Sequence, residues 1–212
     1  MVKRIFDLLN KEIRGLHEAA YLLAFFSLLS QILALVRDRL FAHMFGAGHI
    51  LDTYYAAFKI PDLIFACIAS IVSISVLVPF LVERFGKSYE EERRFINSIF
   101  SVFSIIMVFV SIVVCIFTPH IIKYIYPTLG SYAELILLTR ILLLQPIILG
   151  VSNFLGSITQ AHQRFVSYAM SPVVYNLGII IGIVALYPMF GLVGVVYGVL
   201  LGALLHMSLQ LP

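Results

Sequence analysis

Long apolar runs without charge constrain this sequence more than any other feature. From Ile141 to Pro212, Arg164 is the only charged side chain. A soluble domain carries about 25% charged residues, whereas this chain of 212 residues carries 12%. It also has 61% hydrophobic residues and a mean hydropathy of +1.04. Because so little polar surface cannot cover a water-soluble core, the sequence predicts an integral membrane protein.

Six of the apolar runs are long enough to cross the hydrocarbon layer as α-helices, which takes about 20 residues each. They lie at 19–36, 63–82, 95–118, 141–161, 165–187 and 190–211. A membrane β-barrel needs alternating polar and apolar positions in strands of about 10 residues, and these unbroken runs do not alternate. The predicted fold class is therefore all-α, a six-helix transmembrane lobe over residues 19–212.

Basic residues between the runs predict the orientation of the chain. They gather before the first run, after the second and after the fourth, as Lys3, Arg4, Lys11, Arg14, Arg84, Lys87, Arg93, Arg94 and Arg164. The opposite loops are poorer in charge, with Lys123 after the third run. Since cytoplasmic loops carry the excess of Lys and Arg, we expect the N-terminus in the cytoplasm.

Residues 1–18 have apolar residues at helical spacing with basic residues between them. This pattern is typical of an amphipathic helix on the cytoplasmic membrane surface, held by apolar burial and anionic lipid. A solvated basic tail is the alternative. A signal peptide is disfavoured, because the apolar run after Glu18 is too long and no small-residue cleavage site follows it.

Other features exclude classes of function or indicate packing. The net charge of +3 comes without a dense basic patch, so no nucleic-acid partner is expected. The six His residues have no metal-ligand spacing, and two Cys residues cannot support a disulfide framework. Gly194, Gly198 and Gly202 recur every four residues, which indicates close packing of one helix against another in lipid.

The stretch from Gln31 to Asp62 places charges beside apolar runs. Arg37 and Asp38 continue the helical pattern of the first run, while Asp52 and Lys59 are seven residues apart and share a helix face. Charges at membrane depth cost about 2.5–3.5 kcal/mol each and normally face a wet cavity or a partner. The alternative is that the first helix leaves the membrane at Val36 and the charges are interfacial.

Several motifs resemble those of the MurJ/MviN lipid II flippase family. They are SQILALVRD at 30–38, FGAG at 45–48, Asp52, AFKIPDL at 57–63, VPFL at 78–81, Arg164-Phe165, SPV at 171–173 with Asn176, and LQLP at 209–212. The resemblance runs from about Ser27 to the last residue. It implies a flippase of the multidrug/oligosaccharidyl-lipid/polysaccharide exporter superfamily, of which this chain covers the first of two lobes. We therefore expect a truncated gene or a fragment.

The resemblance also implies a substrate and a site. Family members bind the diphosphate and sugar of lipid II, the undecaprenyl-linked peptidoglycan precursor, in a cationic cavity between the lobes. They move it from the inner to the outer leaflet of the bacterial inner membrane by alternating access, without a cofactor. Arg37 and Asp38 match the cavity Arg–Asp pair, Asp52 matches an acidic residue that the family needs, and Lys59 belongs to the same pattern.

Two positions depart from the family pattern. Gln31 and Phe65 stand where the family has cavity arginines. The predicted cavity residues are therefore Gln31, Arg37, Asp38, Asp52 and Lys59. The lost cations leave open a related exporter for another polyprenyl-linked sugar, or a half-transporter that needs a partner lobe or a second copy. An enzyme is disfavoured, because Glu90, Glu91 and Glu92 are typical of a solvated helix start.

Overall fold

The computed structural model describes residues 15–46, 48–71, 89–127 and 132–211, and within these ranges it is helical without strands. The all-α prediction is confirmed. The elements are α2 (Leu16–Phe45), α3 (His49–Ile71), α5 (Tyr89–Ile125), α6 (Ala133–Leu142), α7 (Leu144–Ala161), α8 (Phe165–Ile181), the π-helical turn η1 (Gly182–Leu186), α9 (Tyr187–Phe190) and α10 (Leu192–Gln210).

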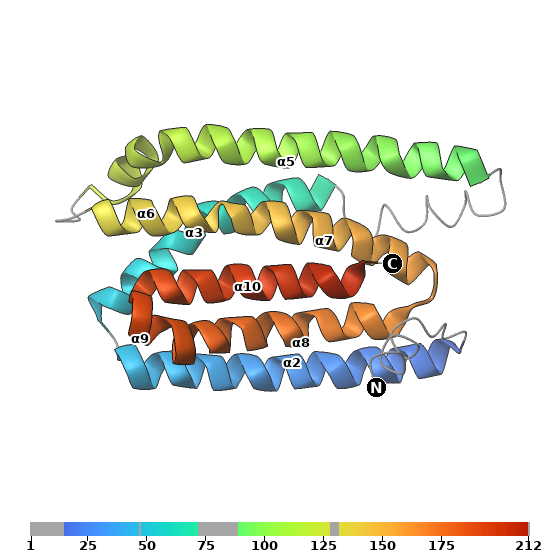
Figure 1. Cartoon of the computed structure of the whole chain (residues 1–212), viewed down its shortest axis with the longest axis horizontal. Helices are drawn as coiled ribbons and strands as arrows, with labels where there is room; N and C mark the ends of the chain where they lie inside the picture. Colours follow the sequence, from blue (N-terminus) through green and yellow to red (C-terminus); the bar gives the residue numbers. More distant parts are fainter. Residues whose placement is uncertain (1–14, 47, 72–88, 128–131, 212) are drawn as a thin grey trace.

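The helices form an elongated bundle in which most axes run nearly parallel to one another (Figure 1). In this view α2, α8, α10, α6 with α7, and α5 follow one another across the bundle, and α3 crosses behind α6 and α7. Helix α8 packs against α2 on one side and α10 on the other. The start of α2 and the end of α10 lie at the same end of the bundle.

Five helical stretches in the described part of the chain are long and apolar enough to cross a membrane. They are His17–Phe45, Arg93–Ile125, Ala133–Ala161, Phe165–Phe190 and Leu192–Gln210. They agree with five of the six predicted runs. The remaining run, 63–82, begins inside α3 and continues outside the described residues. Most of the predicted amphipathic segment, residues 1–14, also lies outside them, and α2 begins at Leu16.

The first helix is longer than its apolar run predicts. Instead of ending at Val36, α2 continues to Phe45, so Arg37 and Asp38 lie within the helix. The helix continues because these residues keep the helical period, and because Arg37 finds polar partners in Asp38 of the same helix and Asn176 of α8. A second boundary also moves: the fourth span begins at Ala133 rather than Ile141, with a turn at Leu143 between α6 and α7.

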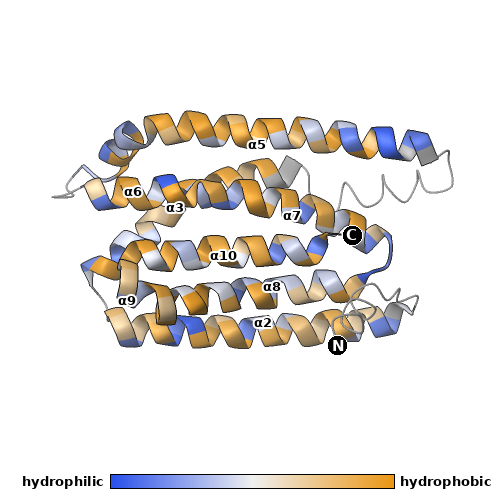
Figure 2. Ribbon diagram, viewed as in Figure 1, coloured by the Kyte–Doolittle hydropathy of each residue, from blue (hydrophilic) through white to orange (hydrophobic). Residues whose placement is uncertain are grey.

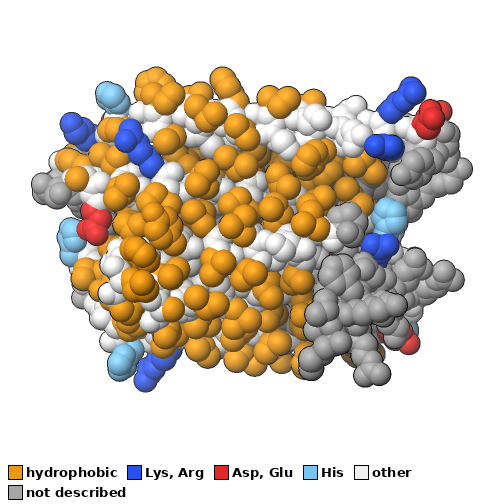
Figure 3. Space-filling view, viewed as in Figure 1, with side chains coloured by type: hydrophobic (Ala, Val, Ile, Leu, Met, Phe, Trp, Pro, Cys, Tyr) orange, Lys and Arg blue, Asp and Glu red, His pale blue; other side chains and the backbone are white. Residues whose placement is uncertain are grey.

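The surface of the bundle is apolar between two polar ends. Hydrophobic residues fill the middle of most helices (Figure 2), and charged side chains gather at both ends of the space-filling view (Figure 3). Large side chains such as Phe25 and Phe109 are 63% and 66% exposed. Exposed apolar surface of this extent is typical of helices that face lipid tails. The structure is that of a multi-pass membrane protein.

Glycines bring α10 and α8 into direct backbone contact. A Cβ atom added to Gly198 would overlap the backbone of Gly182, and one added to Gly202 would overlap the carbonyl of Tyr175. Gly194 lies against the carbonyl of Leu186 in η1. All three glycines of the predicted stripe therefore face α8 and its continuation. Close backbone approach gives van der Waals contact in lipid, where the hydrophobic effect between helices is absent.

Substitution of Gly198 tests this contact. Gly198→Ala should lower the free energy of unfolding by about 1–3 kcal/mol, because the added methyl group overpacks the α8–α10 interface. The measurement is unfolding of the purified chain in detergent. Gly48→Ala is the matched control, since its added Cβ would have no neighbour closer than 4.0 Å. Equal stability of the two variants would contradict the contact.

Candidate substrate site

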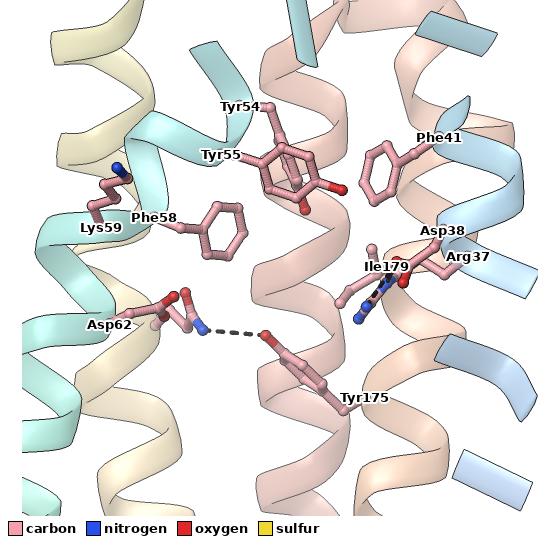
Figure 4. Close-up of a pocket in the computed structure, with 11 residues that line it drawn as sticks. Arg37, Asp38, Phe41, Tyr54, Tyr55, Phe58, Lys59, Asp62, Tyr175 and Ile179 are labelled. Atoms are coloured by element: carbon pink, nitrogen blue, oxygen red, sulfur yellow. Dashed lines mark hydrogen bonds and ion pairs between the residues drawn. The ribbon is translucent and has the colours of Figure 1, made fainter. Parts of the chain in front are cut away.

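A pocket of about 300 Å³ opens between α2 and α3, with α7 and α8 at its base (Figure 4). Its walls carry two cations, two carboxylates and a group of aromatic rings. The lining residues are Arg37, Asp38, Phe41, Tyr54, Tyr55, Phe58, Lys59, Asp62, Gln145, Tyr175 and Ile179. We call this the charged pocket. Charged residues of α2 and α3 meet in this pocket.

The length of α2 determines the depth of Arg37. A 30-residue helix is about 45 Å long, and centring it on a hydrocarbon layer of about 30 Å puts Arg37 roughly 5 Å inside that layer. An arginine at such a depth needs polar partners. The structure provides them from its own helix and from α8, and the side chain is only 24% exposed.

Two partners hold the guanidinium of Arg37. Its Nη2 lies 2.9 Å and its Nε 3.0 Å from Oδ1 of Asp38, the next residue of α2. Its Nη1 donates to Oδ1 of Asn176 on α8, at 3.0 Å. The guanidinium therefore connects the two helices and points into the charged pocket, where Figure 4 shows it beside Ile179.

The amide of Asn176 is itself fixed in orientation. Its Nδ2 donates to Oγ of Ser30 at 3.0 Å and to the carbonyl of Pro172 at 3.1 Å. A further contact of 3.3 Å reaches the carbonyl of Ser30. Because the nitrogen is directed to these acceptors, the oxygen faces Arg37. Asn176 is only 6% exposed, so few other partners are available to it.

Helix α3 supplies the opposite wall. Lys59 lies at the rim, and Asp62, one turn further along α3, points toward the base (Figure 4). Tyr54 packs against Phe41 of α2 with ring centroids 4.8 Å apart, and against Phe58 at the same distance. These rings close the end of the pocket nearest the α2–α3 connection. They form an apolar wall beside the charged groups.

The base of the pocket carries neutral polar groups. Nε2 of Gln145 on α7 donates to the hydroxyl of Tyr175 on α8, at 3.1 Å. Both residues lie in runs predicted as membrane spans, at 141–161 and 165–187. Tyr175 and Asn176 are consecutive residues of α8. Tyr175 lines the base of the pocket, and Asn176 holds Arg37 at its side.

The structure brings together part of the predicted site. Arg37, Asp38 and Lys59 line the charged pocket, whereas Asp52 is exposed on α3 outside it. Gln31 lines a separate groove between α2 and α8. Phe65, at the second altered position, is half-buried and packs against the main hydrophobic core.

Sequence reasoning did not include the aromatic wall among the cavity residues, nor four residues with polar side chains: Asp62, Gln145, Tyr175 and Asn176. Asn176 and Asp62 belong to the motifs that carry the family resemblance, but the motifs do not predict which residues they contact. Gln145 and Tyr175 gave a weaker signal, namely a polar side chain within an apolar run. Nothing in the spacing could pair them, because the pairing depends on how α7 packs beside α8.

Comparison with known proteins decides the family. The family model described as "Lipid II flippase MurJ" matches residues 41–212. The chain belongs to the MurJ family. Among MurJ relatives, the probable lipid II flippase of Buchnera aphidicola subsp. Baizongia pistaciae is 32% identical over 197 residues, which cover 90% of this chain and 38% of that protein. The lipid II flippase MurJ of Thermosipho africanus is 30% identical over 181 residues, or 83% and 37% of the two chains.

A solved structure shows the same helical arrangement. It is titled "Lipid II flippase MurJ, inward closed conformation" and matches with a TM-score of 0.73 at 26% identity. The match covers 89% of this chain and 40% of that one. The chain thus spans about two fifths or less of the MurJ proteins it matches.

A double-mutant cycle tests the Arg37–Asn176 contact. We expect Arg37→Ala and Asn176→Ala to be non-additive, with a coupling free energy of about 0.5–3 kcal/mol, because each removes the partner of the other. The measurement is the free energy of unfolding of the four proteins in detergent.

The Glu90–Arg94 pair gives the control cycle. These two side chains are 78% and 82% exposed and 3.6 Å apart, and exposed helix pairs contribute only about 0.3–0.5 kcal/mol. Additive losses at Arg37 and Asn176 would show that the hydrogen bond does not hold α2 against α8.

Proposed function

We propose that this chain is the N-terminal lobe of a flippase that moves lipid II from the inner to the outer leaflet for cell-wall synthesis. The observation that carries the proposal is Arg37, held by Asp38 and Asn176 and lining the charged pocket. Family membership and the printed names of the relatives support it. The proposed role is transport by alternating access, without chemical catalysis and without a cofactor.

The chemistry of the pocket suits a diphosphate. A guanidinium offers planar paired donors to phosphate oxygens, which a lysine point charge does not. Arg37 uses its Nε and one donor on each Nη within the chain, and each Nη atom carries a second N–H for a ligand. Lys59 faces the same space from α3.

The balance of charge supports a second lobe as partner. Arg37 and Lys59 are matched by Asp38 and Asp62 in the charged pocket. The charges of the pocket therefore sum to zero, and this lobe offers no net positive charge to neutralise a bound diphosphate. We infer that the remaining cations come from a C-terminal lobe or a second copy of this chain, packed over the pocket.

A second candidate is an exporter for another polyprenyl-linked sugar. Gln31 and Phe65, in place of the two arginines of the family pattern, favour it. Either substrate carries a diphosphate, so both candidates need Arg37. They differ in the sugar.

We further propose that the lobe lies in the bacterial inner membrane with its N-terminus in the cytoplasm. Arg93 and Arg94 at the start of α5 and Arg164 at the start of α8 lie at the bundle end where α2 begins. The positive-inside rule assigns that end to the cytoplasm. The charged pocket then lies toward the outer leaflet.

Substitution of Arg37 tests the transport function. In a protein made complete by a second lobe, Arg37→Ala should abolish growth of a bacterium depleted of its own lipid II flippase, because the diphosphate loses its paired donors. Membrane insertion should remain, as an immunoblot of the membrane fraction would verify. Arg94→Ala, which removes an exposed arginine outside the pocket, is the control and should support growth. Normal growth with Arg37→Ala would overturn the assignment.

Thiol labelling tests the orientation. In a Cys67→Ala, Cys115→Ala background, Tyr124→Cys and Glu91→Cys place single thiols at opposite ends of α5. A membrane-impermeant maleimide should label Tyr124→Cys in intact spheroplasts, and Glu91→Cys only after permeabilisation. The reverse pattern would place the N-terminus outside.

A further inference from the structure

A second cavity lies beside the charged pocket, between α2 and α8. It has a volume of about 370 Å³, and its lining contains hydroxyl and amide groups but no charged side chain. The lining residues are Leu23, Ser27, Ser30, Gln31, Ala34, Tyr168, Ala169 and Pro172. We call it the serine groove. It lies closer than the charged pocket to the N-terminal end of α2.

One face of α2 lines both cavities. On this face, Ser27 is followed after three and four residues by Ser30 and Gln31, and Ala34 in the same way by Arg37 and Asp38. At 1.5 Å per residue, the polar part of this face is about 16 Å long from Ser27 to Asp38. Polar groups on a lipid-facing surface are unfavourable. A continuous polar face therefore indicates a path for a polar ligand.

The groove offers a different chemistry from the charged pocket. Gln31 and Ser27 are exposed, so their polar atoms are open to a ligand. An amide and a hydroxyl each both donate and accept hydrogen bonds, which suits the hydroxyl and N-acetyl groups of a sugar. Without a cation, the groove gives a diphosphate no compensating charge.

Hydrogen bonds link the two cavities. Ser30 lines the serine groove and accepts from Asn176, and Asn176 accepts from Arg37 in the charged pocket. The same amide thus positions a group in each cavity. A lipid-linked sugar diphosphate could contact both at once, with its phosphates at Arg37 and its sugar along the groove.

We infer that the serine groove is a sugar-binding subsite and that Gln31 is its specificity-determining residue. The inference rests on the proposed function, because it takes the ligand to be a polyprenyl diphosphate carrying a sugar. It explains how a chain with Gln31 in this groove recognises its substrate by neutral hydrogen bonds. In this arrangement Arg37 binds the diphosphate.

The test compares two ligands on the protein made complete by a second lobe, as in the growth test, in lipid nanodiscs. The probes are lipid II and undecaprenyl diphosphate, which lacks the sugar, each titrated against this protein by microscale thermophoresis. Gln31→Leu should weaken lipid II binding about tenfold, which corresponds to about 1.4 kcal/mol for the lost hydrogen bonding. Binding of undecaprenyl diphosphate should be unchanged. Equal effects on the two ligands, or no effect on either, would overturn the inference.

A matched variant separates groove chemistry from helix composition. Gln31→Leu combined with Ile32→Gln keeps one amide on α2 but moves it to the neighbouring exposed position outside the groove. It should bind like Gln31→Leu, whereas recovery of wild-type binding would overturn the inference.

Arg37→Ala distinguishes failure of the subsite from failure of the function. It should weaken both ligands, because both carry the diphosphate. If wild type binds both ligands through Arg37 while Gln31→Leu has no effect, only the groove inference is overturned. If neither ligand binds, or Arg37→Ala changes neither affinity, the proposed function fails with it.

Discussion

The cost of placing a guanidinium inside a membrane governs this structure. Arg37 lies about 12 Å from the end of α2, deep enough to require partners, and it finds them in Asp38 and Asn176. The contact with Asn176 decides which face of α2 turns toward α8. With that face turned toward α8, residues of α2 three or four positions apart line either the serine groove or the charged pocket. The site is thus a consequence of satisfying one buried charge.

Helix α8 can meet this requirement because its two sides differ. Gly178 of α8 and Gly182 at the start of η1 contact the backbone of α10, while Asn176 of α8 forms hydrogen bonds to α2. Tyr175 reaches Gln145 on α7. Close backbone packing in lipid needs small residues, whereas holding an arginine needs a fixed polar group. Separating these tasks on one helix lets α8 anchor in the bundle and still present a rigid amide to the site.

Apolar runs predict the spans well, because crossing lipid demands a nearly unbroken apolar helix. They do not predict where a helix ends when charges are paired, and α2 therefore continues beyond Val36 to Phe45. Arg37, Asp38 and Lys59 could be predicted from charge and family motif. Gln145 and Tyr175 could not, since each is one polar residue whose partner depends on tertiary packing. Asp52 is the opposite case. The family motif predicts it as a cavity residue, yet it lies outside the charged pocket.

The balance of charge in the pocket also bears on the proposed function, transport of a lipid-linked sugar diphosphate. A lobe that works by alternating access must return without substrate, and an unpaired cation would then face a poorly solvated cavity. Asp38 pairs with Arg37 within the lobe itself, so in the proposed cycle the return step needs no other partner for the guanidinium. Because a diphosphate has to compete with this carboxylate, tight binding by the pocket alone is not expected. Neutral contacts along the serine groove can add affinity for the sugar without adding charge to the empty lobe, which makes Gln31 a better position for selectivity than a further arginine.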